Sequence, residues 1–444
     1  MQVDARGVAL TGASAFARDR YDVAVQQYQS YVGDPVATLD TALADSPGFV
    51  AGHAFKAIAL FTMAEKALIP QVREALAAAS RHAATATGRE RGVIAAGERL
   101  ADGDWHGGAL LLDRVLVDSP RDAVALQAGH LLDFLRGDAT NLRDRVARVL
   151  PHWSADTPGY SYVLGMHAFG LEEMNQYADA EATGRRALEL ERRDGWAVHA
   201  VAHVMEMQGR IDEGAAWLTT READWSPDNG FAFHNWWHLA LFHLDAARHG
   251  DVLALYDRHV HPGPAQFAMT LLDATALLWR LHLEGIDVGD RFERVADEWE
   301  ARLESDRAFY AFNDLHAMLA FVATGRTAAS ERLKGNLALA AAGGDANAAM
   351  SRDVGIPLAQ GIEAFGSGRY EAAADLLESV RPIAQRFGGS HAQRDVITLT
   401  MIEAALRGGT RRRAEHYIGE RLAQRSGNRW GLRLARRAEA LAPH

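Results

Sequence analysis

Two histidine pairs with helical spacing are the part of this sequence that is best suited to chemistry. His199 and His203 are four residues apart, Glu206 follows three residues later, and His234 and His238 form a second pair. Positions i, i+4 and i+7 share one face of an α-helix, so each pair projects two imidazoles in the same direction. If the two helices are neighbours, four imidazoles and a carboxylate converge on one place.

A metal ion is one group on which these side chains can converge. Two histidines four residues apart on a helix can both reach one ion, and imidazole suits Zn or Fe. The zincin motif, however, places a glutamate directly after the first histidine, where this chain has Ala200. Glu206 follows His203, which reverses the Glu-x-x-His order of di-iron bundles. No known metalloenzyme signature is therefore present, and the metal ligands, if an ion binds, are His199, His203, His234 and His238.

Two metal-free alternatives remain open for the same residues. One is a pocket that binds a small polar or anionic molecule, with histidine as acid or base near neutral pH. The other is a hydrogen-bonded polar network with aromatic neighbours and no ligand. For the first alternative the catalytic candidates are His199, His203, Glu206, His234, His238 and His391. The substrate-binding candidates are Asn235, Trp236, Asp273, Asn313, His316, Arg394, Asp395 and His167.

Three other stretches stand out, because polar residues interrupt an apolar run or follow the start of a helix. Asp273 lies in the apolar run MTLLDATALLWRL, and a buried carboxylate there needs an Arg or His partner from a neighbouring helix. Asn313 and His316 are one turn apart and can share a face. Ser390 is a suitable N-cap whose free N–H groups suit an anion. His391 and Asp395 then have the spacing of a hydrogen-bonded pair, with Arg394 between them.

The elements that position these residues are predicted to be helices in pairs. Ala- and Leu-rich segments of helical periodicity are broken by Gly, Pro or Asp, and no run alternates like a strand. The stretch GSGRYEAAADLLESVRP (366–382) matches the turn and second helix of a tetratricopeptide repeat, as does 103–120. Ala180 and Gly214 occupy the same small-residue position, and their numbers differ by 34, the tetratricopeptide period.

We therefore predict an all-α fold, a right-handed α-solenoid of tetratricopeptide-like helix-turn-helix repeats. Residues 1–444 form one continuous domain, with 1–40 as an N-terminal cap and 400–444 as C-terminal capping helices. Histidine recurs on the first helix of successive pairs, which line the concave surface of such a solenoid. That recurrence favours an interior pocket. The recurring histidines are His53, His130, His167, His199, His203, His234, His238, His316 and His391.

Composition excludes several classes of protein. The formal net charge of −11 opposes binding to nucleic acid, which needs clustered Lys and Arg, so we expect no nucleic acid as a partner. The chain has no cysteine, which excludes disulfides and thiolate metal sites. We see neither a secretory signal nor an apolar run long enough for a membrane span, so we expect a cytoplasmic protein without a membrane partner.

Several long motifs resemble one known family, the tetratricopeptide repeat protein 38 family. They are WAVHAVAHVMEMQGRIDEGAAWL (196–218), FHNWWHLALFHLD (233–245), FNDLHAMLAFVATGR (312–326), FGGSHAQRDV (387–396) and ALADSPGFVAGHAFKAIAL (42–60). The resemblance covers nearly the whole chain. It implies a divergent tetratricopeptide array, and it carries over no settled activity, cofactor or catalytic residue.

We therefore favour a small-molecule-binding protein, and within that class an enzyme with hydrolase- or lyase-like acid–base chemistry in a His- and Trp-lined concave pocket. The alternatives are a non-catalytic scaffold that binds a peptide or partner protein, and a His-ligated metal-dependent enzyme with Zn or Fe. A homodimer is a further possible assembly. The substrate does not follow from these residues.

Overall fold

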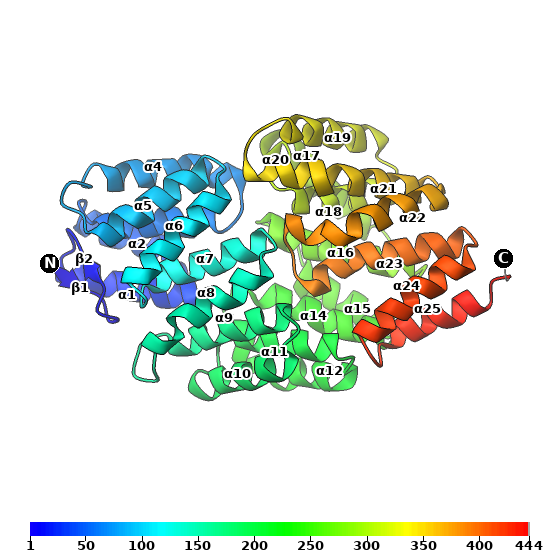
Figure 1. Cartoon of the computed structure of the whole chain (residues 1–444), viewed down its shortest axis with the longest axis horizontal. Helices are drawn as coiled ribbons and strands as arrows, with labels where there is room; N and C mark the ends of the chain where they lie inside the picture. Colours follow the sequence, from blue (N-terminus) through cyan, green and yellow to red (C-terminus); the bar gives the residue numbers. More distant parts are fainter. Residues whose placement is uncertain (443–444) are drawn as a thin grey trace. The chain divides into compact units, whose positions relative to one another are not determined.

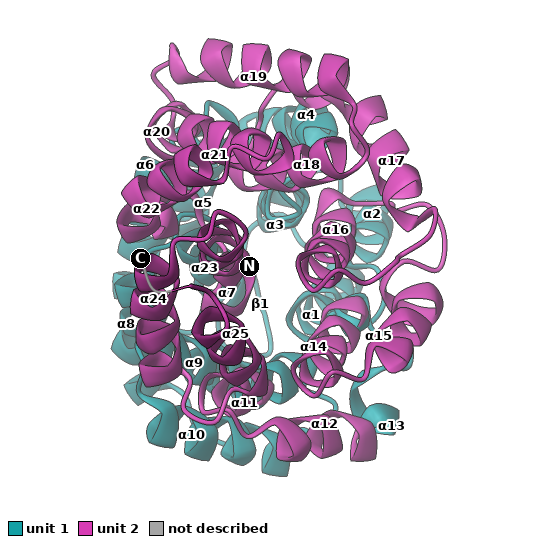
Figure 2. Ribbon diagram, turned by 90° about the vertical axis from the view of Figure 1, so that its right-hand side faces the viewer, with its two compact units in different colours: residues 1–201, 222–232 teal, residues 202–221, 233–444 magenta. Residues whose placement is uncertain are grey.

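The computed structural model describes residues 1–442, and within them helices dominate. These residues divide into two compact units, residues 1–201 with 222–232 and residues 202–221 with 233–444, of which 443–444 lie outside the described part (Figure 2). The all-α prediction is confirmed. The prediction of one continuous domain with two caps stays a prediction.

The first unit consists of antiparallel helix pairs that follow one another along the chain (Figure 1). Neighbouring pairs pack through their apolar faces, and Phe49, Phe55 and Phe169 are among its fully buried side chains. Its helices are α1 (Ala15–Ser30), α2 (Pro35–Asp45), α3 (Val50–Phe61), η1 (Lys66–Leu68), α4 (Ile69–Ser80), α5 (Gly88–Ala101), α6 (Trp105–Asp118), α7 (Ala123–Leu135), α8 (Ala139–Val149), η2 (Leu150–His152), α9 (Tyr160–Glu173), α10 (Tyr177–Leu190) and α13 (Glu222–Trp225).

A small β-hairpin precedes these helices and was not predicted. Strands β1 (Gln2–Val3) and β2 (Ala9–Leu10) pair antiparallel. Asp4 stabilises the turn between the strands, because its carboxylate accepts the backbone N–H groups of Arg6 and Val8. Gly7 takes the positive φ that this turn requires. Strands of two residues are too short to show an alternating pattern in the sequence.

The second unit continues the same pattern of helix pairs. Trp237, Trp279 and Phe321 are fully buried in it. Helix α11 (Gly195–Met207) contains the boundary between the units. The other elements are α12 (Ile211–Thr220), α14 (Ala232–Asp245), α15 (His249–Leu255), η3 (Tyr256–Val260), α16 (Ala268–Leu283), α17 (Arg291–Asp306), α18 (Ala311–Ala323), α19 (Thr327–Ala341), α20 (Ala346–Met350), η4 (Ser351–Gly355), α21 (Ile356–Gly366), α22 (Tyr370–Val380), η5 (Arg381–Phe387), α23 (His391–Arg407), α24 (Arg411–Gln424) and α25 (Arg429–Glu439).

The turn within each helix pair repeats one local conformation. A residue with positive φ follows the first helix, and glycine usually occupies it because glycine has no Cβ to clash there. The next backbone N–H then bonds a carbonyl five residues back, as Arg369 does to Ala364. The glycines in this position are Gly103, Gly137, Gly209, Gly285, Gly325, Gly368 and Gly409. These are the breaks from which the repeat was predicted.

No helix among residues 1–442 combines the length and the apolar character needed to cross a bilayer.

Candidate metal centre

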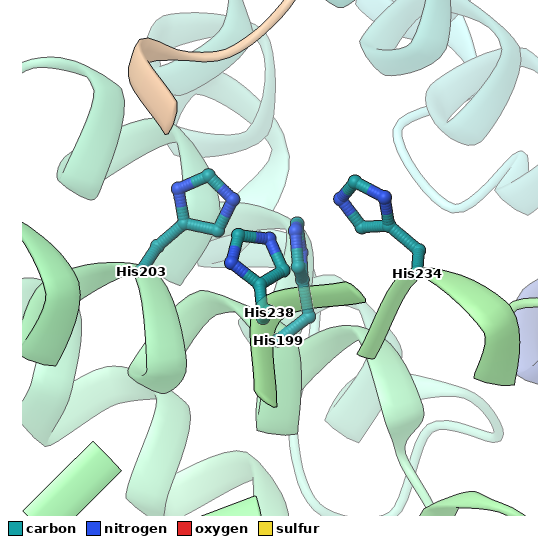
Figure 3. A group of neighbouring side chains, drawn as sticks. All are labelled: His199, His203, His234 and His238. Atoms are coloured by element: carbon teal, nitrogen blue, oxygen red, sulfur yellow. The ribbon is translucent and has the colours of Figure 1, made fainter. Parts of the chain in front are cut away.

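Three buried histidines of the second unit lie side by side. Helix α11 carries His203, and helix α14 carries His234 and His238 one turn apart. The ring centroids of His203 and His238 are 4.4 Å apart, and those of His234 and His238 are 4.8 Å apart. His199 lies one turn before His203 on α11. Each of the four offers a nitrogen within 4.8 Å of the others (Figure 3). The predicted convergence of the two histidine pairs therefore occurs.

Carboxylates fix two of these imidazoles. Nδ1 of His234 lies 2.6 Å from Oδ2 of Asp273, and Nδ1 of His238 lies 3.1 Å from Oε2 of Glu206. A carboxylate only accepts hydrogen bonds, so Nδ1 carries the proton in both rings. The lone pair of each ring is then on Nε2, the nitrogen that can act as a metal ligand. This carboxylate–histidine arrangement is the usual support of histidines that bind a metal.

Both supporting carboxylates have further partners in the second unit. The second oxygen of Glu206 accepts Nη1 of Arg425 at 2.9 Å, although the two residues are 219 positions apart. The second oxygen of Asp273 accepts the side-chain amide of Gln393 at 3.4 Å. Asp273 was expected to pair with an Arg or His of a neighbouring helix, and His234 is that residue. Neither Arg425 nor Gln393 was singled out in the sequence.

The start of helix α23 differs in part from the prediction. Ser390 is its N-cap, and the cap is reciprocal because the side chain of Gln393 accepts the backbone N–H of Ser390. The predicted His391–Asp395 pair does not form. Asp395 binds the guanidinium of Arg421 instead, since a buried arginine is a stronger partner for a carboxylate than a neutral imidazole. The sequence signal for Gln393 was the spacing Ser-x-x-Gln of a capping box.

Arg394 and His391 make local contacts at the same helix start. The guanidinium of Arg394 donates to the backbone carbonyls of Gly388 and Gly389, and its Nη2 lies 3.3 Å from Nδ1 of His391. Arg394 was predicted to hold an anion, and His391 to take part in catalysis. Both roles stay predictions.

The other predicted substrate-binding residues lie in several places. Asn235 is buried in α14, and the ring of Trp236 stacks on His259 at 3.9 Å between centroids. Nδ1 of His316 in α18 donates to the carbonyl of Phe312 at 2.8 Å, and Asn313 is half-buried one turn earlier. His167 belongs to α9 of the first unit and is half-buried there. Their roles as ligand contacts stay predictions.

Burial controls the protonation of the interior of the second unit. It lowers the pKa of His238 well below its usual range, and the charges of His203, His234, Arg280 and Arg425 add to the effect. It also lowers the pKa of His316 to about 4 and that of Arg280 to about 10. At neutral pH His238 and His316 are therefore neutral, whereas Arg280 remains charged.

The donor set fits a transition metal ion. Imidazole nitrogens bind Zn²⁺ at about 2.0–2.1 Å, which spaces four tetrahedral ligands roughly 3.3 Å apart. Nitrogens within 4.8 Å of one another reach that spacing through small side-chain rotations. Neutral nitrogen ligands without a thiolate suit Zn, Fe, Ni or Cu. The zincin general base remains missing, because the buried methyl group of Ala200 occupies its position.

Comparisons with known proteins concern the fold. No family model matches the chain. Among solved structures, the human IFIT1 dimer with m7Gppp-AAAA is similar with 12% identity and a TM-score of 0.44, covering 95% of this chain and 94% of that one. A monomeric IFIT1 mutant with Gppp-AAAA is similar with 13% identity and a TM-score of 0.36, covering 95% and 100%.

These structures overturn one expectation from the sequence. We expected no nucleic acid among the partners, and that exclusion is wrong, because both similar structures contain capped RNA. The exclusion rested on net charge, which sums over the whole chain, whereas binding depends on the local distribution of Lys and Arg. The correction withdraws the exclusion and assigns no RNA site to this chain. The fold itself is an all-α helical repeat of the broad tetratricopeptide type.

Proposed function

We propose that this protein binds a transition metal ion, Zn or Fe, through His199, His203, His234 and His238, and that a small molecule joins that ion as a fifth ligand. The observation that supports this most is the pair of carboxylate-held imidazoles, His234 with Asp273 and His238 with Glu206. In both rings the lone pair is on Nε2, the nitrogen that can bind a metal. Within this proposal the protein is a metal-dependent enzyme rather than a scaffold.

Each residue has a distinct role at the proposed centre. The four histidines hold the ion, whereas Glu206 and Asp273 are positioning residues that set the tautomer and the orientation of the rings. A bound Zn or Fe ion supplies Lewis-acid chemistry and lowers the pKa of a bound water. Because imidazole binds a metal in its neutral form, the four ligands do not offset the charge of the ion toward a bound molecule.

Two other buried histidines of the chain serve as a comparison, because their hydrogen bonds suit a purely structural role. His130 in the first unit and His316 in the second both place Nδ1 against a backbone carbonyl, of Leu142 and Phe312 respectively. That contact secures a neighbouring helix turn and needs no ion. His234 and His238 bind carboxylates and, unlike His130 and His316, belong to the group of four histidines that each offer a nitrogen within 4.8 Å of the others, which favours the metal site over a polar network without a ligand.

We also propose that the chain belongs to the tetratricopeptide repeat protein 38 family. The long motifs at 196–218, 233–245, 312–326 and 387–396 support this assignment. The first two contain the four proposed ligands, so the assignment predicts that other members keep these histidines. If an alignment of family members showed that these four positions vary freely, the metal site would not be a shared property of the family.

Metal analysis of protein purified without an affinity tag tests the proposed centre. After loading with Zn²⁺ or Fe²⁺ and removal of excess metal, we expect about one ion per chain. His203→Ala and His238→Ala should lose the ion while far-UV circular dichroism stays close to wild type. His282→Asn is the matched control, because His282 is a half-buried histidine of the same unit outside the group. Wild-type protein without bound metal would overturn the proposal.

Glu206→Gln tests the positioning role separately. Loss of an outer carboxylate typically weakens metal affinity by about 10- to 100-fold. We expect this loss in a competition titration with a chelator, with about one ion still bound at saturation. A purely structural role of Glu206 would lower stability and leave metal affinity unchanged.

A further inference from the structure

Arg280 of helix α16 is a buried cation with no carboxylate beside it. Its side chain is 1% exposed. Its guanidinium donates to the backbone carbonyls of Ala276 at 3.0 Å and Ala392 at 2.7 Å. Among residues 1–442 it forms no ion pair, whereas Arg425 and Arg421 in the same unit bind Glu206 and Asp395. Backbone carbonyls orient a guanidinium but do not balance its charge, so this site suits an anion.

Arg280 and the proposed ligand His234 contact the same aromatic ring, that of Trp237. Its guanidinium carbon is 5.4 Å from the ring centroid of Trp237. Trp237 in turn stacks on His234, with centroids 5.2 Å apart and planes inclined by 15°. The indole thus contacts both the cation and a proposed ligand. Arg280 and the proposed ligand His234 are therefore separated by no more than one aromatic ring.

Two polar atoms in this region have no hydrogen-bond partner in the described chain. They are Nε1 of Trp237 and Nε2 of His316, and both residues are 0% exposed. The indole nitrogen only donates, and Nε2 of His316 accepts because its Nδ1 already donates to Phe312. Buried polar atoms without a protein partner are usually satisfied by a ligand or an ordered water.

We propose that the small molecule bound at the metal centre is an anion, with carboxylate or phosphate oxygens between the ion and Arg280. This inference rests on the proposed metal site and adds the class of its substrate. The guanidinium of Arg280 supplies the charge, and the indole N–H of Trp237 supplies a hydrogen-bond donor. Anionic oxygens are the groups that a guanidinium binds best.

Cobalt-loaded protein provides the test, because the visible absorption of Co²⁺ changes when a ligand joins the ion. The probes are inorganic phosphate and acetate, with acetamide as an uncharged analogue of acetate. In wild-type protein we expect saturable spectral changes with phosphate or acetate and none with acetamide. The relative affinities of the two anions distinguish a phosphate substrate from a carboxylate substrate.

Two variants separate the anion site from the metal site. Arg280→Met removes the charge at similar length, and we expect at least a tenfold rise in the Kd of the anion with an unchanged affinity for Co²⁺. Arg433→Gln is the control, because Arg433 is a partly exposed arginine of the same unit paired with Glu284. If Arg280→Met loses its helical circular dichroism, Trp237→Phe replaces it, with an expected rise of about threefold to tenfold.

The outcomes distinguish the two proposals. Cobalt binding without any response to anions would overturn the anion site and leave the metal site standing. Unchanged anion affinity in Arg280→Met, or in Trp237→Phe where that variant replaces it, would also overturn the anion site. Failure of wild-type protein to bind Co²⁺ would overturn both.

Discussion

Buried carboxylates in this protein differ in how fully their charge is compensated. Asp273 accepts N–H groups from His234 and Gln393. Asp194 in the first unit accepts the backbone N–H of Ala197 at 2.9 Å through Oδ1, and its Oδ2 has no partner among residues 1–442. Burial therefore dominates and raises the pKa of Asp194 to about 7, against the opposing effect of its backbone hydrogen bonds.

The stability of the first unit should depend on pH through Asp194. Its pKa is near 4 in the unfolded chain and about 7 in the folded one, so between these values only the folded state holds the proton. The free energy of unfolding should therefore fall as pH rises from 4 to 7, by up to about 4 kcal/mol. Asp194→Asn should flatten this dependence in urea unfolding curves.

Asp156→Asn serves as the control for this prediction, because Asp156 is exposed in the same unit. It should keep the wild-type slope of stability against pH. If Asp194→Asn and wild-type protein have parallel slopes over this pH range, burial does not raise the pKa of Asp194.

At the scale of elements, small residues set how closely the helices approach one another. Gly214 on α12 faces Phe242 on α14, and a Cβ at Gly214 would overlap the phenyl ring. This is the small-residue position that the repeat pattern predicted from Ala180. Because α14 also carries His234 and His238, the packing of α12 against α14 helps to set the position of two proposed ligands.

Enlarging Gly214 should disturb both stability and the metal centre. Gly214→Val forces α12 away from Phe242, and overpacking of this kind typically costs about 1–3 kcal/mol. We expect that loss in denaturant unfolding, together with weaker Zn²⁺ binding because α14 shifts. Wild-type stability in this variant would show that the two helices are not in close contact.

Gly335→Ala is the matched glycine substitution. Gly335 lies exposed in α19, and a Cβ there would meet no atom within 4 Å. Alanine forms helix better than glycine by about 1 kcal/mol, so this variant should be slightly more stable than wild type. If Gly214→Val lowers the free energy of unfolding and Gly335→Ala raises it, the loss at Gly214 comes from packing and not from the conformational freedom of the glycine backbone.

At the scale of the whole molecule, the start of α25 forms hydrogen bonds with the end of α14, the helix that carries His234 and His238. The carboxylate of Asp245, the last residue of α14, accepts the side-chain amide of Asn428 at 2.6 Å. It also accepts the backbone N–H groups of Arg429 and Trp430, which begin α25. These partners are more than 180 positions apart in the sequence. We propose that α24 and α25 act as the C-terminal cap of the second unit.

Removing that contact should loosen the C-terminal cap. Asp245→Ala leaves two backbone N–H groups at the start of α25 and the amide of Asn428 without their acceptor, at a cost of about 1–3 kcal/mol. Amide hydrogen exchange in 429–439 should become faster while exchange in the first unit stays unchanged. Asp251→Ala is the control, because Asp251 is exposed. Equal exchange in both variants would exclude an anchoring role for Asp245.

The repeat architecture follows from short stretches of sequence. Helical periodicity, the glycines of the turns and the period between Ala180 and Gly214 are local signals, because each depends on residues within one helix pair. The two histidine pairs are local in the same sense, since a spacing of four residues places both rings on one face. For this reason the helix pairs, the N-cap at Ser390 and the pairing of histidines within α11 and α14 could all be predicted.

The partners of those histidines were decided by tertiary structure alone. Asp273 lies 39 positions from His234, and Arg425 lies 219 positions from Glu206, so no periodicity relates them. Arg280 was missed for the same reason, and so was the contact between Gln393 and Asp273. His391 and Asp395 had the spacing of a pair, but folding brought Arg421 to Asp395. A buried charge binds the strongest partner that packing places beside it, and local sequence spacing does not determine which partner that is.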